Sequence, residues 1–241
     1  MTIPKHLLFD GAIPHEAQEL AGQLAKMEPE KSGLSDWQRA RLGKITASHF
    51  GDVKYLKSGA WGETALTYLY DLIGEHLTGQ PSESFTGSKA TEWGNQYEEE
   101  ALMAYKQRTG RKTKLGHFLQ DPKNPLVGGT PDAFCGEQGV LEIKCPFNFK
   151  NHLRTVITKK VPDDYKSQVL GHLMLSGREW CDFVSYDPRI KSQHRLVIVR
   201  VKAKEVQVEM DELAQRIIDF HKLLLKQLEV LKIKSIHPIK F

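Results

Sequence analysis

Hydrophobic residues recur at helical spacing toward both ends of the chain, whereas its middle shows the shorter period of β-strands. The clearest helical pattern covers residues 63–77, where Leu66, Leu69, Tyr70 and Ile73 share one side. Capping residues and the same spacing predict the remaining helices. These cover 15–27, a stretch that begins at Ser35 or Asp36, a short helix capped by Thr46 or Ser48, 90–109, 163–175 and 206–231.

Short runs with two-residue alternation fill the middle of the chain, and Gly, Pro, Asp and Asn separate them. The predicted strands are 115–119, 127–130, 132–135, 140–145, 181–186 and 196–201. Helices on both sides of a run of strands predict a mixed α/β (α+β) fold, in which helices flank a central mixed β-sheet.

The amino-acid composition is typical of a water-soluble globular protein. The chain has 241 residues, of which 40% are hydrophobic and 27% charged, and its mean hydropathy is −0.44. No apolar run approaches the roughly 18 residues that a membrane span needs, and residues 1–10 are too polar for a signal peptide. Three isolated cysteines without a CxxC pair are typical of reduced thiols. We therefore expect a cytoplasmic protein without membrane contact.

The chain divides into two unequal parts. Residues 28–35 (EPEKSGLS) are rich in helix breakers, so we predict an N-terminal extension over 1–34, helical or loosely ordered, and a single domain over 35–241. The net charge of +4 is a mild basic excess. By itself this excess does not separate a DNA-binding protein from an ordinary enzyme.

The most informative polar residues lie on two neighbouring strands. In 139–145 (GVLEIKC), alternation places Glu142 and Lys144 on the same face. If 136–138 form a three-residue loop, Asp132 lies directly opposite Glu142 and the two carboxylates share that face. A four-residue loop would place them on opposite faces. A solvated, charged strand face is the alternative interpretation of this pattern.

Two carboxylates at that separation repel each other unless a cation joins them. Oxygen ligands without His or Cys favour Mg²⁺, with Mn²⁺ as a substitute, over zinc. Lys144 on the same face suits a residue that orients an attacking water or stabilises developing phosphate charge.

A third carboxylate is expected from the helix at 90–109. Glu98 falls on the apolar side of that helix, whereas Glu99 and Glu100 turn toward solvent. An acidic group on the inward side needs a partner, and a metal ion would be one. A half-exposed glutamate at the helix edge is the alternative.

Six short blocks occur in an order that resembles a known nuclease family. The blocks are Arg41 with ITAS (45–48), WGNQYE (93–98), TPD (130–132), LEIKCPF (141–147), Gln168 and YDPR (186–189). Over about residues 35–231 the chain resembles the phage lambda exonuclease family, the viral-type (alkaline exonuclease) branch of the PD-(D/E)XK nucleases. The resemblance implies a restriction-endonuclease-like core.

The resemblance also implies roles for individual residues. Asp132, Glu142 and the backbone carbonyl of Ile143 would hold metal in a two-metal site. Glu98 would be an outer or second-metal carboxylate, and Lys144 the general base or the water-orienting lysine. The residues that would line a pocket for a 5′-phosphate are Arg41, Ser48, Thr130 and Gln168.

Two of these pocket residues suit a phosphate on chemical grounds. Arg41 offers a planar fork of donors, and Ser48, near a helix start, presents a hydroxyl and backbone N–H groups. Ordinary surface and capping roles are the alternative for both residues.

The resemblance implies Mg²⁺-dependent 5′→3′ digestion of one strand of linear double-stranded DNA from its end. It further implies phage-type recombination in a bacterial or phage-infected cell, a ring-shaped homotrimer, and a single-strand annealing protein as partner. A structure-specific or endonucleolytic nuclease on the same core, and a DNA-binding module with a degenerate site, stay open as alternatives. We expect the basic residues of a DNA-binding face to converge: Arg39, Arg41, Arg111, Lys112, Lys114, Lys144, Lys150 and Arg154.

Overall fold

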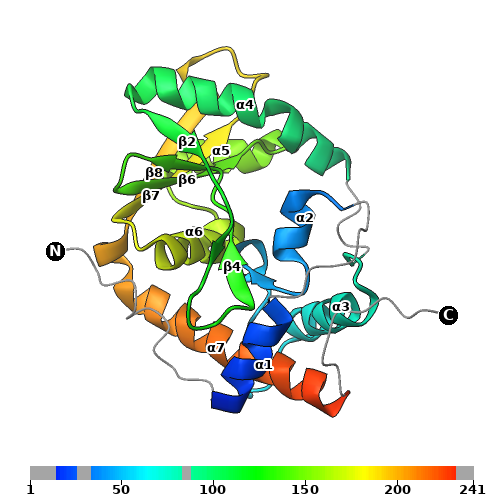
Figure 1. Ribbon diagram of the computed structural model, residues 1–241. Helices are drawn as coiled ribbons and strands as arrows, with labels where there is room; N and C mark the ends of the chain where they lie inside the picture. The colour runs from blue at the N-terminus through cyan, green and yellow to red at the C-terminus, as the bar shows by residue number, and fades with distance from the viewer. Residues whose placement is uncertain (1–14, 26–33, 83–87, 232–241) are drawn as a thin grey trace.

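The computed structural model describes residues 15–25, 34–82 and 88–231 (Figure 1). Helices surround two β-sheets, which confirms the predicted mixed α/β class. No helix in these ranges is both long and apolar enough to cross a membrane. The α-helices are α1 (His15–Ala25), α2 (Asp36–Arg41), α3 (Glu63–Thr78), α4 (Lys89–Thr109), α5 (Phe149–Thr158), α6 (Asp163–Ser176) and α7 (Gln207–Val230).

The larger sheet has five strands in the order β2-β5-β6-β7-β8, and the smaller sheet has the order β1-β4-β3. Within the larger sheet only β6 and β7 run parallel, which makes it mixed. The strands and 3₁₀ turns are β1 (Ile45–Thr46), η1 (Ala47–His49), β2 (Thr113–Leu115), β3 (Leu119–Gln120), β4 (Val127–Gly129), β5 (Ala133–Cys135), β6 (Gly139–Lys144), β7 (Trp180–Tyr186), η3 (Gln193–Arg195), β8 (Leu196–Lys202) and η4 (Ala203–Glu205).

The predicted strand 115–119 is wrong, because it is two strands that belong to different sheets. The chain turns between β2 and β3 at Gly116. A Cβ atom on this glycine would lie 1.6 Å from the carbonyl oxygen of Pro131, so only glycine allows the two segments to pass this closely.

The helix predictions also need two corrections. The short helix expected after Thr46 is only the 3₁₀ turn η1, because Thr46 itself belongs to strand β1. Helix α5 is absent from the predicted elements. Its sequence signal is the N-cap Asn148, whose side chain accepts a hydrogen bond from the backbone N–H of Lys150.

Apolar side chains form two cores, one on each face of the five-stranded sheet. In Figure 1, α4 lies above this sheet and α6 and α7 lie below it. Leu141 and Ile143 pack on the α4 side with Ala101 and Tyr105, whereas Val140 belongs to the larger core on the other side. The alternation along β6 therefore directs its even-numbered side chains toward α6, as the sequence predicts.

Helix α7 packs within the chain along most of its length. Leu224 and Leu228, four residues apart on one side of the helix, are fully buried, so this apolar side packs on the core of the same chain. Helix α1 packs against α7 and buries Ala21 and Leu24 in the larger core. This part of the predicted extension thus contributes to the core, while 1–14 and 26–33 lie outside the described residues.

Candidate active site

The β5–β6 hairpin has the three-residue loop on which the sequence argument depends. Cys135 pairs with Gly139 and Ala133 pairs with Leu141, and continuing this register places Asp132 opposite residue 142. The Asp132 backbone N–H donates to the carbonyl of Leu141 over 3.1 Å. The hairpin therefore brings the two predicted metal-binding carboxylates to the same end of the sheet.

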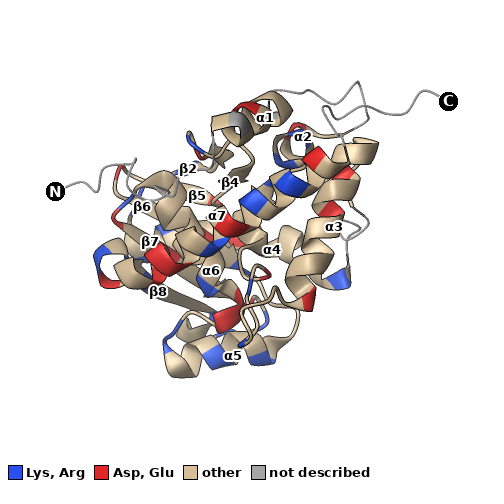
Figure 2. Cartoon of the chain, turned by 90° about the horizontal axis from the view of Figure 1, so that it is seen from below, with Lys and Arg blue, Asp and Glu red and all other residues tan. Residues whose placement is uncertain are grey.

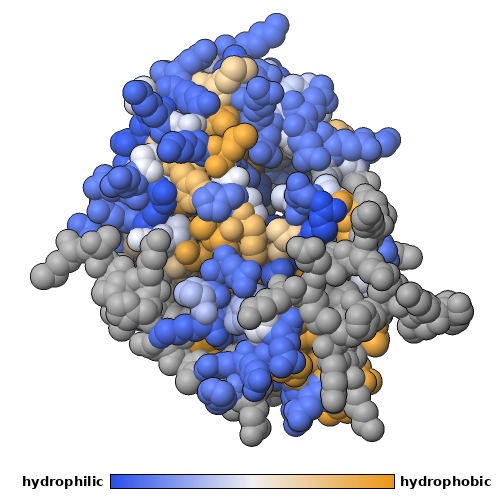
Figure 3. Space-filling model, viewed as in Figure 1, coloured by the Kyte–Doolittle hydropathy of each residue, from blue (hydrophilic) through white to orange (hydrophobic). Residues whose placement is uncertain are grey.

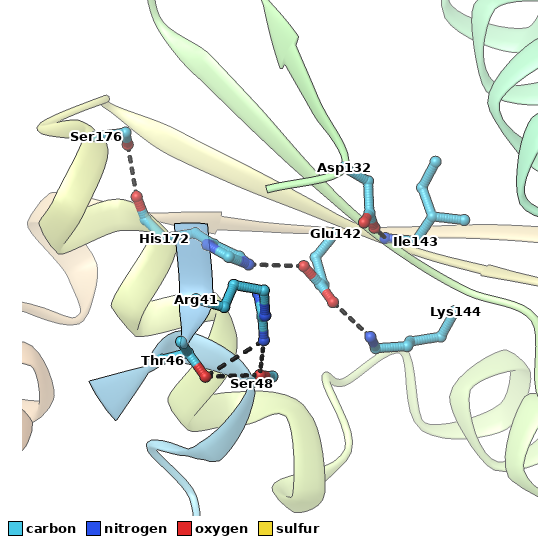
Figure 4. Close-up of polar contacts among 9 residues, drawn as sticks. All are labelled: Arg41, Thr46, Ser48, Asp132, Glu142, Ile143, Lys144, His172 and Ser176. Carbon is cyan, nitrogen blue, oxygen red and sulfur yellow. Dashed lines mark hydrogen bonds and ion pairs between the residues drawn. The ribbon is translucent and has the colours of Figure 1, made fainter. Parts of the chain in front are cut away.

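Glu142 is fully buried between two basic side chains (Figure 4). Lys144 Nζ lies 2.6 Å from its Oε1 atom, and His172 Nε2 lies 2.8 Å from its Oε2 atom. Burial by itself would raise the pKa of Glu142, but Lys144 and His172 lower it to about 2. The carboxylate is thus ionised and can only accept hydrogen bonds, so the Nε2 atom of His172 carries a proton and donates it.

The second carboxylate is held in an unfavourable electrostatic environment. Burial and then repulsion from Glu142 raise the pKa of Asp132 well above its usual range. One oxygen of Asp132 accepts the backbone N–H of Ile143. Attraction to Glu142 and Asp132 outweighs burial and raises the pKa of Lys144. A single ammonium group thus faces two carboxylates, an arrangement that a further cation would relieve.

The oxygen donors at this position fit a hard, partly hydrated divalent cation. Side chains of Asp132 and Glu142 and the carbonyl of Ile143 lie where the two strands meet. Within the described part of the chain, no cluster of three or more His, Cys, Asp and Glu side chains could enclose a metal. Mg²⁺ commonly keeps several waters and binds through one or two carboxylates, so the donor set suits Mg²⁺.

Glu98 lines a cavity that Lys144 and Ile143 also line. It is exposed on α4 and lines a cavity of about 360 Å³ together with Lys144, Phe147 and Tyr165. Its carboxylate lies within electrostatic range of Lys144 and Glu142. The structure therefore brings Glu98 to the same site, as a solvent-facing wall.

The side chain of Glu100 is 44% exposed, which agrees with the expected turn toward solvent, but it is also paired. Its carboxylate accepts hydrogen bonds from the Tyr186 hydroxyl at 2.5 Å and from Arg195 at 2.8 Å. Both partners come from the β7–β8 region, which α4 crosses. An acidic side chain beside that crossing is thus half-buried and paired.

Arg41 occupies a second recess close to Glu142 (Figure 4). Its Nη2 atom donates to Ser48 Oγ over 2.6 Å and lies 3.3 Å from Thr46 Oγ1. The guanidinium stacks on Trp37, and its buried Nε atom has no hydrogen-bond partner. Burial lowers the pKa of Arg41.

Two buried basic side chains, Arg41 and Lys44, line this second recess together with the buried carboxylate of Glu75, which accepts the backbone N–H groups of Gly43 and Ser82. Among the described residues, neither Arg41 nor the adjacent buried Lys44 forms an ion pair with a carboxylate; Lys44 Nζ donates to the carbonyl of Ala40 over 3.0 Å. Figure 3 shows that the surface is hollowed between α4 and α2, the helices that carry Glu98 and Arg41. Such a recess suits an anion.

Local sequence explains why Arg41 stands there. Ser35 caps α2 through a reciprocal capping box with Gln38, which confirms the predicted helix start. The helix ends at Arg41, and the chain then enters β1 and η1, which carry the two hydroxyl partners of Arg41. Arg41 thus contacts residues that follow it by only five positions (Thr46) and seven positions (Ser48) in the chain.

Thr130 directly follows β4 and Gln168 lies on α6, and both β4 and α6 contact η1, which carries Ser48. Gly129 packs closely on Ala47, where a Cβ on the glycine would lie 2.7 Å from the alanine Cβ, so Thr130 follows beside Ser48. Gln168 is half-buried on α6, one turn before His172 on the same side. Among the hydrogen bonds of the described residues, none joins Thr130 or Gln168 to Arg41.

Two functional contacts are missing from the sequence-based set. His172 holds Glu142, and Trp37 stacks on Arg41. The signal for His172 is its position one helical turn after Gln168, on the same polar strip. The signal for Trp37 is its spacing of four residues from Arg41 within α2.

The eight basic residues do not all converge, so that expectation is wrong. Arg111 stacks on Trp180, with 5.0 Å between its guanidinium carbon and the ring centroid. Trp180 pairs with Gly139 at the start of β6, whereas Lys144 is at the end of the same strand. Strand length therefore separates Arg111 from the site.

Comparison with known proteins gives this arrangement a family context. The YqaJ-like viral recombinase domain matches residues 36–179. No curated protein matches the chain. The alkaline exonuclease LHK-Exo from Laribacter hongkongensis is 30% identical, with a TM-score of 0.73, and the match covers 82% of this chain and 95% of that chain.

Two further crystal structures are similar. LHK-Exo in complex with dAMP is 29% identical, with a TM-score of 0.69, over 82% of this chain and 97% of that chain. A phage-related exonuclease from Haemophilus somnus 129PT, 18% identical with a TM-score of 0.57 over 77% and 96% of the two chains, shares the fold. The chain therefore belongs to the YqaJ-like viral recombinase family, in agreement with the resemblance to the lambda-exonuclease branch of the PD-(D/E)XK nucleases.

Proposed function

We propose that this protein is a Mg²⁺-dependent deoxyribonuclease that digests one strand of linear double-stranded DNA 5′→3′ from its end. The observation that carries the proposal is the juxtaposition of the Asp132–Glu142–Lys144 group with the anion-suited recess of Arg41. The names of the similar proteins support it: one is an alkaline exonuclease, and its complex with dAMP places a nucleoside monophosphate in a protein of this fold.

In this proposal, the carboxylates hold the metal ions and Lys144 acts on the water or the phosphate. Asp132, Glu142 and the Ile143 carbonyl would hold one Mg²⁺, and Glu98 would face a second across the cavity. When bound, Mg²⁺ supplies a more acidic water and stabilises charge on the phosphoryl group and on the leaving 3′-oxygen. Lys144 orients the attacking water or stabilises the developing phosphate charge. Mn²⁺ would substitute for Mg²⁺, because the ligands are oxygens.

Recognition of the strand end is assigned to the recess around Arg41. A 5′-phosphate there would accept hydrogen bonds from the guanidinium and from the Ser48 hydroxyl, and would neutralise an unpaired buried cation. Thr130 and Gln168 would line the remaining sides of this pocket. Placement of the terminal phosphate beside Glu142 would put the next phosphodiester near the carboxylates, and hydrolysis there would release one nucleotide from the strand end.

We further propose that the enzyme acts in phage-type recombination inside a bacterial or phage-infected cell. The family name supports this role. A single-strand annealing protein would take over the exposed strand, and a ring-shaped homotrimer would retain the DNA between successive cleavages. Both assemblies remain proposals that rest on the family resemblance.

Substrate topology tests the proposed function. Linear duplex, nicked circle and covalently closed circle are incubated with Mg²⁺ or with EDTA, and released nucleotides are measured. We expect release from the linear duplex alone, and only with Mg²⁺. Cutting of the closed circle would replace the proposal with an endonuclease, and binding without any cleavage would replace it with a DNA-binding module.

A further inference from the structure

Helix α5 presents polar side chains to the protein interior. His152 is fully buried. Its Nδ1 atom lies 2.8 Å from Ser185 Oγ, and its Nε2 atom lies 2.8 Å from the carbonyl oxygen of His194. The other buried side chain of this helix is Thr155. The two hydrogen bonds of His152 thus attach α5 to the β7–β8 region.

The apolar side of α5 faces solvent. Phe149, Leu153 and Ile157 follow one another at four-residue spacing and are 50%, 37% and 80% exposed. Phe147, just before the helix, is 49% exposed. Contiguous hydrophobic side chains are rarely left exposed on a globular protein, because their contact with water is unfavourable. Where they occur, they mark an interaction surface.

The charge of this segment indicates an anionic partner. Residues 147–160 contain four basic residues and no acidic residue, and the α5 ribbon in Figure 2 shows the same imbalance. At 100° per residue, Lys150 and Arg154 lie along the Ile157 edge of the apolar stripe. The remaining two, Lys159 and Lys160, follow the helix.

The surface is continuous with the candidate active site. Phe147 and Asn151 line the same cavity as Lys144. The Phe147 ring packs edge-on against Trp93, with 5.8 Å between centroids. The guanidinium of Arg189 in turn stacks on the Trp93 ring, 4.7 Å from its centroid. An aromatic surface therefore extends from Lys144 to α5, with Glu98 and the Asp187-paired Arg189 beside it.

We propose that Phe147 and the exposed face of α5 bind single-stranded DNA next to the site of hydrolysis. Unpaired bases would stack on Phe147 and Phe149, while phosphates contact Lys150 and Arg154. A duplex offers no base faces for such stacking, so this surface fits the strand after it has separated from its complement. The inference rests on the proposed function, since it identifies where the strand lies beyond Lys144.

Charge also argues against a two-fold contact in which α5 meets the same helix of a second copy. An isologous contact between two copies would oppose two acid-free basic segments. A single strand of DNA, in contrast, brings the negative charge and the flat apolar surfaces that the residues require. A contact between copies is therefore retained only as an outcome of the test.

Binding without catalysis tests the proposal separately from the proposed function. Affinity for a fluorescein-labelled 12-nucleotide oligo-dT is measured by anisotropy in EDTA, where no hydrolysis is needed. Phe149→Ala should weaken binding at least about fivefold. Lys150→Glu with Arg154→Glu should weaken it further and reduce its dependence on salt. The three substituted side chains, Phe149, Lys150 and Arg154, are exposed, so circular dichroism should show folded variants.

Matched controls come from exposed residues on other helices. Tyr70→Ala on α3 and Lys226→Glu on α7 should leave the affinity unchanged. Equal affinities of wild type, Phe149→Ala and the double variant would overturn the proposal. Unchanged affinity together with a changed sedimentation coefficient would show a contact between copies instead. If the variants lose oligo-dT binding but the wild type never hydrolyses DNA, the proposed binding surface stands and the proposed nuclease function is rejected.

Discussion

His172 donates a hydrogen bond of 2.8 Å to Glu142, although thirty positions separate the two residues in the chain. The imidazole comes from α6 and the carboxylate from β6, and both side chains are buried. The other ring nitrogen of His172 is buried without a hydrogen-bond partner. Because His172 holds the Oε2 atom of Glu142, the Oε1 atom is the one that faces Lys144.

Substitution of His172 should weaken metal binding more than it weakens the fold. His172→Leu removes the donor that orients Glu142, and loss of such a partner typically reduces metal affinity or activity 10- to 100-fold. Calorimetric titration of the protein with Mn²⁺ measures the affinity directly. His172→Gln, which retains an N–H donor, should recover part of it. Equal Mn²⁺ affinity in wild type and His172→Leu would remove this positioning role.

Lys144→Ala should abolish nuclease activity on linear duplex, with a loss of about 10²-fold or more. The substitution removes the ammonium that contacts Glu142 at 2.6 Å and faces the cavity. Single-turnover rates with Mg²⁺ at saturating DNA isolate the chemical step from DNA binding. Full activity of a folded Lys144→Ala variant would show that another group orients the water.

Arg41→Ala should remove the preference for a phosphorylated end. Wild-type enzyme should digest a 5′-phosphorylated linear duplex faster than a 5′-hydroxyl duplex, because the phosphate pairs with the buried guanidinium. In Arg41→Ala the two rates should become equal. Arg41→Lys should restore the preference poorly, since lysine lacks the planar fork that contacts Ser48 and Thr46. Equal rates for the two ends in the wild type would contradict the pocket assignment.

Divalent cations should stabilise the folded protein through the Asp132–Glu142 pair. Binding at a concentration 100 times Kd adds about 2.7 kcal/mol to the free energy of unfolding. Asp132→Asn removes one of two repelling carboxylates but keeps an oxygen that accepts the Ile143 N–H. We expect the variant to melt no lower than wild type in EDTA and to lose the Mg²⁺-induced rise in Tm. A variant that gains the same stabilisation from Mg²⁺ would place the metal elsewhere.

Acid should destabilise the protein partly through His221 in α7. Burial lowers the pKa of His221 to about 3 from an ordinary value of 6.5, and neither ring nitrogen has a hydrogen-bond partner within the described structure. The unfolded chain takes up a proton below pH 6.5, whereas the folded chain does so only near pH 3. The stability contributed by the neutral ring is therefore complete above pH 6.5 and falls as the pH drops toward 3.

His221→Leu should remove this acid sensitivity. Between pH 7 and pH 5, the variant should lose about 2 kcal/mol less free energy of unfolding than wild type. Urea unfolding curves at the two pH values measure the difference, and His15→Ala, at an exposed position, serves as the control. Parallel losses in wild type and His221→Leu would show that the buried ring does not set the acid limit.

Local patterns were sufficient to predict the hairpin that carries Asp132 and Glu142. The alternation in 139–145 and the length of the 136–138 loop together determine that Asp132 stands opposite Glu142, and the observed register agrees. The start of α2 at Ser35 is equally local, because the capping box joins residues three apart. In each case, the interacting residues are close enough in sequence for backbone geometry to decide their contact.

Long-range packing decided what surrounds that hairpin. The contact of His172 with Glu142 depends on how α6 crosses the sheet, and the position of Arg41 beside the same carboxylate depends on how α2 and β1 pack below it. The pattern of α5 is misleading on its own, because its apolar face is directed to solvent and His152 is directed inward.

The sequence by itself therefore determined the α/β class, the family and the pair of carboxylates, since each depends on residues in order or within a few positions. Strand alternation already places Lys144 beside Glu142, but only the tertiary structure decided which basic residues of other elements reach the site: Arg41 does, whereas Arg111 stacks on Trp180 at the opposite end of β6. The physical reason is that side-chain periodicity specifies a face of an element, while the position of that face relative to another element depends on packing of the whole core.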